Sequence, residues 1–322
     1  MLLVPRRRRS GQARIVHPRP ARSRWFFLIL LGLSAIAIPT ALERDELEGR
    51  SVGISPGEAG QFSAGVRLVE VYATVTDARG EPVQNLPQDA FRVWEERVPQ
   101  EISAFAAGDV PLSLAIGLDR SFSVPRPNLL EITRAAQGLL DDLRPDDRTL
   151  LMAIGSRPEI LAPLGAARAD TRRALGGIDS WGTTPLHDSV IAAIDAIAAT
   201  SGRRALILFS DGRDRYSEAS AADVVAHARE RDVIVYPIAI GRDAVPLFAE
   251  IAAATGGRSF RAPDPSSLRT TLSVIARELR AQYLLGYVPT VAAQDGPAWR
   301  SIQVRVEHPG VRVRAREGYL AR

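Results

Sequence analysis

The chain has 322 residues, 46% of them hydrophobic, which is enough to bury one or two cores. The absence of cysteine excludes a disulfide framework and a thiolate metal site. The formal net charge is +4, but eight of the 41 basic residues lie in residues 1–24, and the other 33 are outnumbered by 37 acidic residues. This balance removes the main electrostatic argument for nucleic acid, and no nucleic-acid partner is predicted.

The N-terminus has the pattern of an export signal. Residues 1–24 form a basic leader without an acidic residue, and residues 25–38 carry no charge. An apolar run of this length is typical of the core of a signal peptide rather than of a full membrane span. Small residues at 35–37 and 39–41 would allow cleavage, whereas the arginines also suit an uncleaved inner-membrane anchor. Residues 25–41 are therefore predicted to be a signal-peptide core or a membrane anchor, rather than a buried helix. The folded part would then be periplasmic, extracellular, or anchored outside the cytoplasm.

A polar linker is predicted over residues 42–61, followed by a strand-rich segment over residues 62–110. In this segment apolar residues alternate with polar ones, which indicates a half-buried strand: Val69, Val71, Ala73 and Val75 against Glu70, Tyr72, Thr74 and Thr76. Two shorter strand-like pieces follow, and no helical pattern occurs before residue 111.

Residues 111–282 have a different pattern, in which apolar runs of strand length alternate with helical stripes. The predicted strands cover residues 112–118, 149–154, 205–209 and 233–240, and the predicted helices cover residues 129–143, 186–197 and 221–231. A last helix is predicted over residues 265–281, with Asp264 as its N-cap. This alternation predicts a doubly wound, mostly parallel sheet with helices on both faces.

Strand-like alternation returns in residues 283–322, for example at Ile302, Val304 and Val306. The simplest explanation is one small β-sandwich built from residues 62–110 and 283–322, with the α/β region inserted between them. Two independent β extensions are the alternative.

Oxygen-bearing side chains stand at three ends of the predicted elements. Asp119, Ser121 and Ser123 follow the first strand of the α/β region, Thr184 opens a helix, and Asp211 follows the strand at 205–209. Because the carboxyl ends of strands in such sheets converge on one crevice, we expect these five side chains to meet. Hydroxyl and carboxylate oxygens are hard ligands, which suit Mg²⁺ or Mn²⁺.

At these positions the chain resembles the von Willebrand factor type A family, whose metal-ion-dependent adhesion site combines an Asp-x-Ser-x-Ser loop with a threonine and a second aspartate. The resemblance covers roughly residues 110–282 and includes the Gly-Thr-Thr-Pro-Leu run at 182–186. It implies that Asp119, Ser121, Ser123, Thr184 and Asp211 hold the ion. It also implies an open coordination position for an acidic side chain of a partner protein.

Some positions leave alternatives. Thr183 competes with Thr184, which stands directly before Pro-Leu as in the family, and Asp214 is interpreted as a group outside the ligand set. Arg120 and Phe122 replace the small residues common in this loop, which would alter the choice of partner. The flanks, with Val-Tyr-Ala-Thr-Val-Thr-Asp at 71–77, resemble bacterial secreted proteins of the acidobacterial von Willebrand factor A-related type.

We therefore expect a metal-dependent protein-binding or adhesion module of the bacterial cell envelope, and no enzyme. A Gly-rich phosphate loop, a Gly-x-Ser-x-Gly elbow and a His-Glu-x-x-His motif are all absent from the sequence. The alternatives are a scaffolding protein whose ion only fixes the loops and, less favoured, a metal-dependent hydrolase. The sequence predicts no particular oligomeric state. In related domains the last helix shifts on ligation, so we also expect the helix at 265–281 to pass this movement to the second flank.

Overall fold

The computed structural model describes residues 68–108, 110–290 and 297–321. The predicted leader, signal or anchor segment and linker lie outside the described residues. In the described part, none of the helices has both the length and the apolar character needed to cross a membrane.

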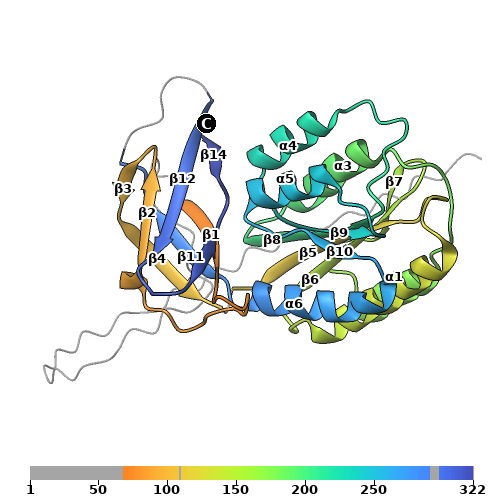
Figure 1. Ribbon diagram of the computed structural model, residues 1–322, viewed down its shortest axis with the longest axis horizontal. Coiled ribbons are helices and arrows are strands. Elements are labelled where there is room, and N and C mark those ends of the chain that lie inside the picture. Colours follow the sequence, from red (N-terminus) through yellow and green to blue (C-terminus); the bar gives the residue numbers. More distant parts are fainter. Residues whose placement is uncertain (1–67, 109, 291–296, 322) are drawn as a thin grey trace, which may run out of the picture. The chain divides into compact units, whose positions relative to one another are not determined.

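The α/β region is built on a six-stranded sheet in the order β10-β9-β8-β5-β6-β7 (Figure 1). The strands are β5 (Leu112–Asp119), β6 (Arg148–Ile154), β7 (Pro158–Ala162), β8 (Arg203–Ser210), β9 (Ile234–Ile240) and β10 (Phe260–Ala262). All neighbours are parallel except β6 and β7. The predicted doubly wound, mostly parallel sheet is confirmed.

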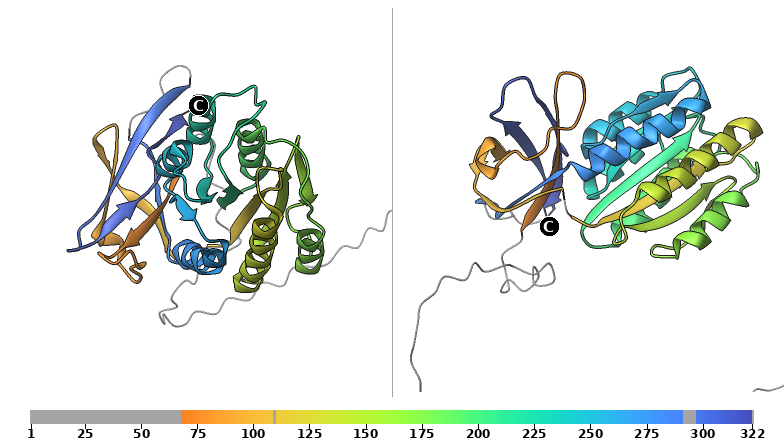
Figure 2. Two further views of the ribbon diagram at one scale, coloured as in Figure 1. Left: turned by 45° about the vertical axis from the view of Figure 1, so that its right-hand side comes forward. Right: turned by 90° about the horizontal axis from the view of Figure 1, so that it is seen from below.

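Helices cover both faces of this sheet, as Figures 1 and 2 show. The six helices are α1 (Arg126–Asp142), α2 (Arg168–Gly176), α3 (Leu186–Ala198), α4 (Ala221–Glu230), α5 (Pro246–Thr255) and α6 (Leu268–Arg280). Buried residues of α1, α2 and α6 share one core cluster with the sheet, while α3, α4 and α5 contribute to the other. Successive strand residues point to opposite faces, so Leu114 and Ile116 pack into the first cluster and Ala115 into the second.

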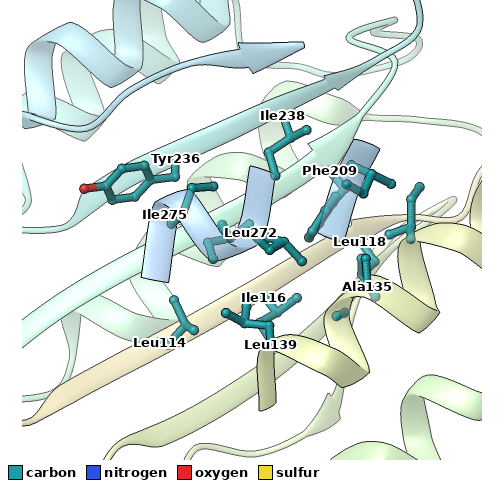
Figure 3. Packing of buried hydrophobic residues seen from close by; sticks show 14 of the residues in the cluster. Leu114, Ile116, Leu118, Ala135, Leu139, Phe209, Tyr236, Ile238, Leu272 and Ile275 are labelled. Carbon is teal, nitrogen blue, oxygen red and sulfur yellow. The ribbon is translucent and has the colours of Figure 1, made fainter. Parts of the chain in front are cut away.

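The first core shows how the helical spacing is used (Figure 3). Leu272 and Ile275 of α6 pack with Leu114 and Ile116 of β5 and with Leu139 of α1, and each of these side chains is at most 2% exposed. Full burial of one such side chain contributes about 1.5–3 kcal/mol. This apolar contact fixes β5, and with it the position of the loop that follows the strand.

The structure differs from the predicted elements in some places. The helix predicted over residues 265–281 begins as a 3-10 turn, Pro265–Ser267, in which the carboxylate of Asp264 accepts a hydrogen bond from the backbone N–H of Ser266 at 2.9 Å. The regular helix α6 starts only at Leu268. The short helices α2 and α5 and the edge strands β7 and β10 are not among the elements predicted from the sequence.

Two four-stranded sheets, β13-β1-β11-β4 and β14-β12-β2-β3, form the β-sandwich. Their strands are β1 (Val69–Thr76), β2 (Phe91–Glu95), β3 (Val98–Gln100), β4 (Ile102–Ala107), β11 (Tyr283–Tyr287), β12 (Ala298–Val306), β13 (Arg312–Arg314) and β14 (Gly318–Ala321), with a 3-10 turn at Gln88–Ala90. Strand β1 pairs with β11, β2 pairs with β12, and both sheets share one apolar core. The two flanks therefore fold together, and the alternative of two independent β extensions is wrong.

Helix α6 is tied to the sandwich at its last turn. Glu278 is fully buried, and its carboxylate oxygens lie 3.0 Å from Nη1 of Arg258 and 2.6 Å from Nη2 of Arg314 in β13. A second ion pair joins Arg316 to Asp232 at 3.1 Å, between the sandwich and the loop before β9. Glu278 is the fully buried member of these pairs, and without its arginine partners it would be an uncompensated buried charge, so the contacts hold the end of α6 against the sandwich.

Candidate metal centre

Asp119 is the last residue of β5, and its side chain is fully buried. Its Oδ1 accepts a hydrogen bond from the backbone N–H of Ser121 at 2.9 Å, and its Oδ2 accepts one from the hydroxyl of Ser210 at 2.6 Å. Ser210 ends the neighbouring strand β8. Both carboxylate oxygens are therefore held in place before any ligand binds.

The loop after β5 presents two hydroxyls. The Oγ atoms of Ser121 and Ser123 lie 3.0 Å apart, Ser121 being buried and Ser123 partly exposed. The loop is fixed by backbone hydrogen bonds from Arg120 to the carbonyl of Ile154 at 2.9 Å and from Val124 to the carbonyl of Ser121 at 3.0 Å. The first of these joins the loop to the end of β6.

Thr184 lies in the loop before α3 and is buried, whereas Thr183 is exposed. This loop is hydrogen-bonded to the Asp119 loop twice, from Trp181 N to the carbonyl of Arg120 at 2.8 Å and from Phe122 N to the carbonyl of Gly182 at 3.1 Å. Gly182 has φ +87°, and a Cβ there would lie 2.5 Å from the backbone nitrogen of Ser156. A glycine is therefore required at this close approach.

Asp211 follows β8 directly, and its side chain is 13% exposed. Its Oδ1 accepts a hydrogen bond from the backbone N–H of Arg213 at 3.1 Å, and its Oδ2 lies 3.7 Å from Nε of the same arginine. The loop is held against the threonine loop because Arg215 N donates to the carbonyl of Thr184 at 2.7 Å. Three loops thus form one site at the carboxyl edge of the sheet.

A pocket of about 320 Å³ opens over these loops. It is lined by Ser121, Phe122, Ser123, Gly182, Thr183, Thr184, Arg213 and Arg215. The structure therefore brings the three predicted hydroxyl residues to one pocket, with Asp119 bonded beneath Ser121. Thr183 also lines the pocket, so both threonines stay candidates for the metal ligand, and they differ in that Thr184 is buried and Thr183 is exposed.

The ionised carboxylate of Asp119 is destabilised by its surroundings, and a nearby positive charge would stabilise it. Burial raises the pKa of its carboxyl above the ordinary value, and the charge of Asp211 raises it further, while hydrogen bonds from Ser121 and Ser210 lower it. Within the described residues no arginine or histidine forms an ion pair with Asp119. The pocket is lined by hydroxyls, whereas the carboxylates of Asp119 and Asp211 do not line it. The two carboxylates lie near enough to interact electrostatically, and hydroxyl and carboxylate oxygens together suit a hard divalent cation. In the described part of the chain no three His, Cys, Asp or Glu side chains gather as a metal group, so such a site depends on the hydroxyls.

Asp214 has a different place. Its Oδ1 accepts hydrogen bonds from the backbone N–H of His187 at 3.1 Å and from the hydroxyl of Ser217 at 2.6 Å. His187 lies in the first turn of α3, directly after the threonine loop. Asp214 therefore fixes the start of α3 and with it the backbone on which Thr184 lies.

The sequence reasoning missed Ser210. The residue stands beside Asp211 in the Ser-Asp-Gly run, but only the strand register places its hydroxyl next to Asp119, because Leu118 pairs with Phe209. A polar residue at the very end of an otherwise apolar strand is the one signal that could have indicated its role.

The comparison with known families agrees with this geometry. A sequence model of the von Willebrand factor type A domain matches residues 114–273. These residues belong to the von Willebrand factor type A family. The predicted family resemblance is thereby confirmed, while the bacterial subfamily stays a prediction. No curated protein sequence matches the chain.

Several solved structures are similar to this chain over half of its length or more. Proximal thread matrix protein 1 from the mussel byssus is 15% identical over 57% of this chain and 49% of its own, with a TM-score of 0.49. The chain thus spans about half of that protein's length. A von Willebrand factor type A protein from Catenulispora acidiphila is 14% identical over 78% of this chain and 73% of its own, with a TM-score of 0.49. Protein BatB from Bacteroides thetaiotaomicron is 18% identical over 53% of this chain and 100% of its own, with a TM-score of 0.44. Another structure of the mussel protein has a zinc-occupied metal-ion-dependent adhesion site motif.

Proposed function

We propose that the von Willebrand factor A domain binds Mg²⁺ or Mn²⁺ through Asp119, Ser121, Ser123 and Thr184, with Asp211 bound directly or through water. The observation that carries this proposal is the buried Asp119, whose two oxygens are oriented by Ser121 and Ser210. Ser121 in turn lines a pocket with the hydroxyl residues Ser123, Thr183 and Thr184. A buried carboxylate such as that of Asp119 is stabilised most effectively by a cation.

When bound, the ion would offer a Lewis-acidic position to a carboxylate oxygen of a partner protein. The chain's own residues would hold the ion in place. The hydroxyls add no charge, and with Asp211 bound through water only Asp119 would contact the ion as an anion, so a carboxylate from the partner would be a favourable further ligand. We therefore propose a metal-dependent protein-binding or adhesion module with no catalytic activity.

We also propose that the domain functions in the cell envelope, delivered by the basic leader and the apolar segment at residues 25–41, with the folded part outside the cytoplasm. The proposed division of this part is residues 62–110 and 283–322 for the sandwich and 111–282 for the inserted domain. The sequence pattern supports this placement. Cleavage and anchoring remain equal alternatives within it.

Isothermal titration of the full chain with Mg²⁺, Mn²⁺, Ca²⁺ and Zn²⁺ tests the proposal. We expect binding of Mg²⁺ or Mn²⁺ in the wild type and its loss in Asp119→Ala and Ser121→Ala. A chain that binds no ion would contradict the proposal. Phosphatase or peptidase activity that disappears in Asp119→Ala would favour a hydrolase instead.

The scaffolding alternative is separated by the effect of a chelator on a bound partner. A scaffold whose ion only fixes the loops keeps its partner after chelation as long as the chain stays folded, whereas a bridging ion releases it. Circular dichroism in the same buffer supplies the control for folding.

A further inference from the structure

Each of the three loops that form the candidate metal centre carries one exposed aromatic side chain. Phe122 lies between the two serines and is 72% exposed, Trp181 opens the threonine loop at 49%, and Tyr216 lies in the Asp211 loop at 78%. Over the described residues only one other aromatic side chain is exposed, Trp299 of the sandwich, at 40%. Exposed aromatics in the described part are thus concentrated around this one site.

Tyr216 is also held in an unfavourable backbone conformation. Its φ is +72°, in the left-handed region that a bulky side chain rarely adopts. Packing of the side chain does not compensate for this strain, because the side chain is exposed to solvent. Backbone strain of this kind clusters at functional sites, and Tyr216 directly follows Arg215, which lines the pocket.

Two arginines of the same loop line the pocket. Arg215 is exposed, and in the described part its guanidinium has no hydrogen-bond or ion-pair partner. Arg213 is 66% exposed and makes only the loose 3.7 Å contact with Asp211, so most of its five N–H donors are available. Free arginine donors beside a pocket are suited to bind carboxylates in pairs of hydrogen bonds.

On this basis we infer that the rim of Phe122, Trp181, Tyr216, Arg213 and Arg215 binds a partner segment that carries at least two acidic side chains next to an apolar one. This inference rests on the proposed function. One carboxylate would reach the ion, a second would bind Arg215 and Arg213, and the apolar side chain would pack on the aromatic rings. Aromatic residues and arginine are the residue types that dominate binding energy at protein interfaces.

Single-stranded nucleic acid also stacks on aromatic rings and binds arginine. The protein partner is favoured here because, outside residues 1–24, acidic residues outnumber basic ones, 37 to 33, which repels a polyanion. A short acidic segment avoids most of that repulsion while satisfying both arginines.

Fluorescently labelled synthetic peptides test the inference by anisotropy with the full chain in Mg²⁺. Four peptides share one Gly-Ser background. The first carries one glutamate, and the second carries two glutamates separated by one residue. The third adds a leucine next to this pair, and the fourth is the third peptide with both glutamates changed to glutamine. We expect affinity to rise from the first to the third and to be lost in the fourth. Arg215→Ala should weaken the two-glutamate peptides about 10-fold and leave the one-glutamate peptide unchanged.

The aromatic part of the inference has its own variant. Phe122→Ala should reduce the gain from the leucine, whereas Arg79→Ala, which removes an exposed arginine from a sandwich turn, should change nothing. These side chains are exposed, so all three variants should melt like the wild type in chelator.

The outcomes separate this inference from the proposed function. If Mg²⁺ binds but the one- and two-glutamate peptides bind equally, or if Arg215→Ala has no effect, the inference is wrong while the metal site stands. If Mg²⁺ does not bind, the proposed function fails and the inference with it. A thymidine oligonucleotide that competes as well as the third peptide would also overturn the acidic partner.

Discussion

The hydroxyl of Ser210 donates a hydrogen bond to Oδ2 of Asp119 across 2.6 Å, from the strand next to the one that carries the aspartate. The other oxygen of Asp119 is held by the backbone N–H of Ser121 at 2.9 Å. Because both oxygens are fixed by different elements, the carboxylate cannot rotate without breaking one of the bonds. Ser210 is therefore a positioning residue for the candidate ion.

Ser210→Ala should weaken the binding of Mg²⁺ about 10- to 100-fold, which is the usual effect of losing a partner that orients a ligand. Titration calorimetry measures this change. Ser113→Ala is the matched control, since it removes another buried serine from the opposite end of β5, where Ser113 contacts Arg148 at 3.1 Å. An unchanged affinity in Ser210→Ala, or an equal loss in Ser113→Ala, would contradict the assigned role.

The pH dependence of the metal-free protein follows from Asp119. Burial raises the pKa of this carboxyl above 3.8, so the folded chain keeps its proton to higher pH than the unfolded chain. In the interval between the two pKa values the folded state binds more protons, and stability falls as pH rises. Asp119→Asn removes the charge, and the hydroxyl of Ser210 can reverse its hydrogen bond to suit the amide.

In chelator, the melting midpoint of Asp119→Asn should therefore exceed that of the wild type by an amount that grows as pH rises from the ordinary pKa of an aspartate to the raised pKa of Asp119, and then stays constant. Thermal melts over a series of pH values provide the measurement. A difference that does not change with pH, or a variant that is less stable than the wild type at neutral pH, would contradict the cause given for the shift.

Asp214 is expected to act on the threonine loop rather than on the ion. Asp214→Ala removes the acceptor for His187 N and Ser217 Oγ at the start of α3, which should lower the free energy of unfolding by about 1–2 kcal/mol. Chemical denaturation should give the same loss with chelator and with Mg²⁺. If Mg²⁺ no longer stabilised Asp214→Ala but still stabilised Asp211→Ala, the ligand assignment would have to be exchanged between these two aspartates.

The expected coupling between the metal centre and the sandwich can be followed at Glu278 and Arg314. A displacement of α6 would have to separate their 2.6 Å contact, so amide exchange in the last turn of α6 and in β13 should change together when Mg²⁺ and an acidic peptide bind. In Arg314→Ala the change should be confined to α6. Hydrogen exchange read by mass spectrometry distinguishes these patterns, and an identical exchange of β13 in every state would show that no coupling exists.

Elements with a clear period could be predicted from the sequence. Leu186, Val190, Ile194 and Ile197 of α3 repeat at helical spacing, and all four are fully buried. The strand runs of the central sheet were placed to within one or two residues, because apolar strands buried on both faces stand out between helices. The candidate ligands stood out because Asp119, Ser121, Ser123 and Asp211 lie at or just after the ends of such strands and Thr184 precedes a helix, while their role as ligands stays a prediction.

The elements that were not predicted, α2, α5, β7 and β10, lack a clear periodic pattern of apolar residues. Helix α2 is dominated by charged residues and buries only Thr171 and Leu175, while α5 is apolar on nearly every side. Strand β7 is an exposed edge that begins at Pro158, and β10 has three residues. The role of Ser210 depends on the register between β5 and β8, which tertiary packing decides.

The central claim, a divalent cation held by Asp119 and its neighbours, is tested most directly by thermal unfolding of the full chain in chelator and in increasing Mg²⁺ or Mn²⁺. Binding to the folded state alone should raise the midpoint with ion concentration, by the equivalent of about 2.7 kcal/mol at 100 times the dissociation constant. The rise should be absent in Asp119→Asn. A wild-type midpoint that stays the same in chelator and in every ion would contradict the metal centre.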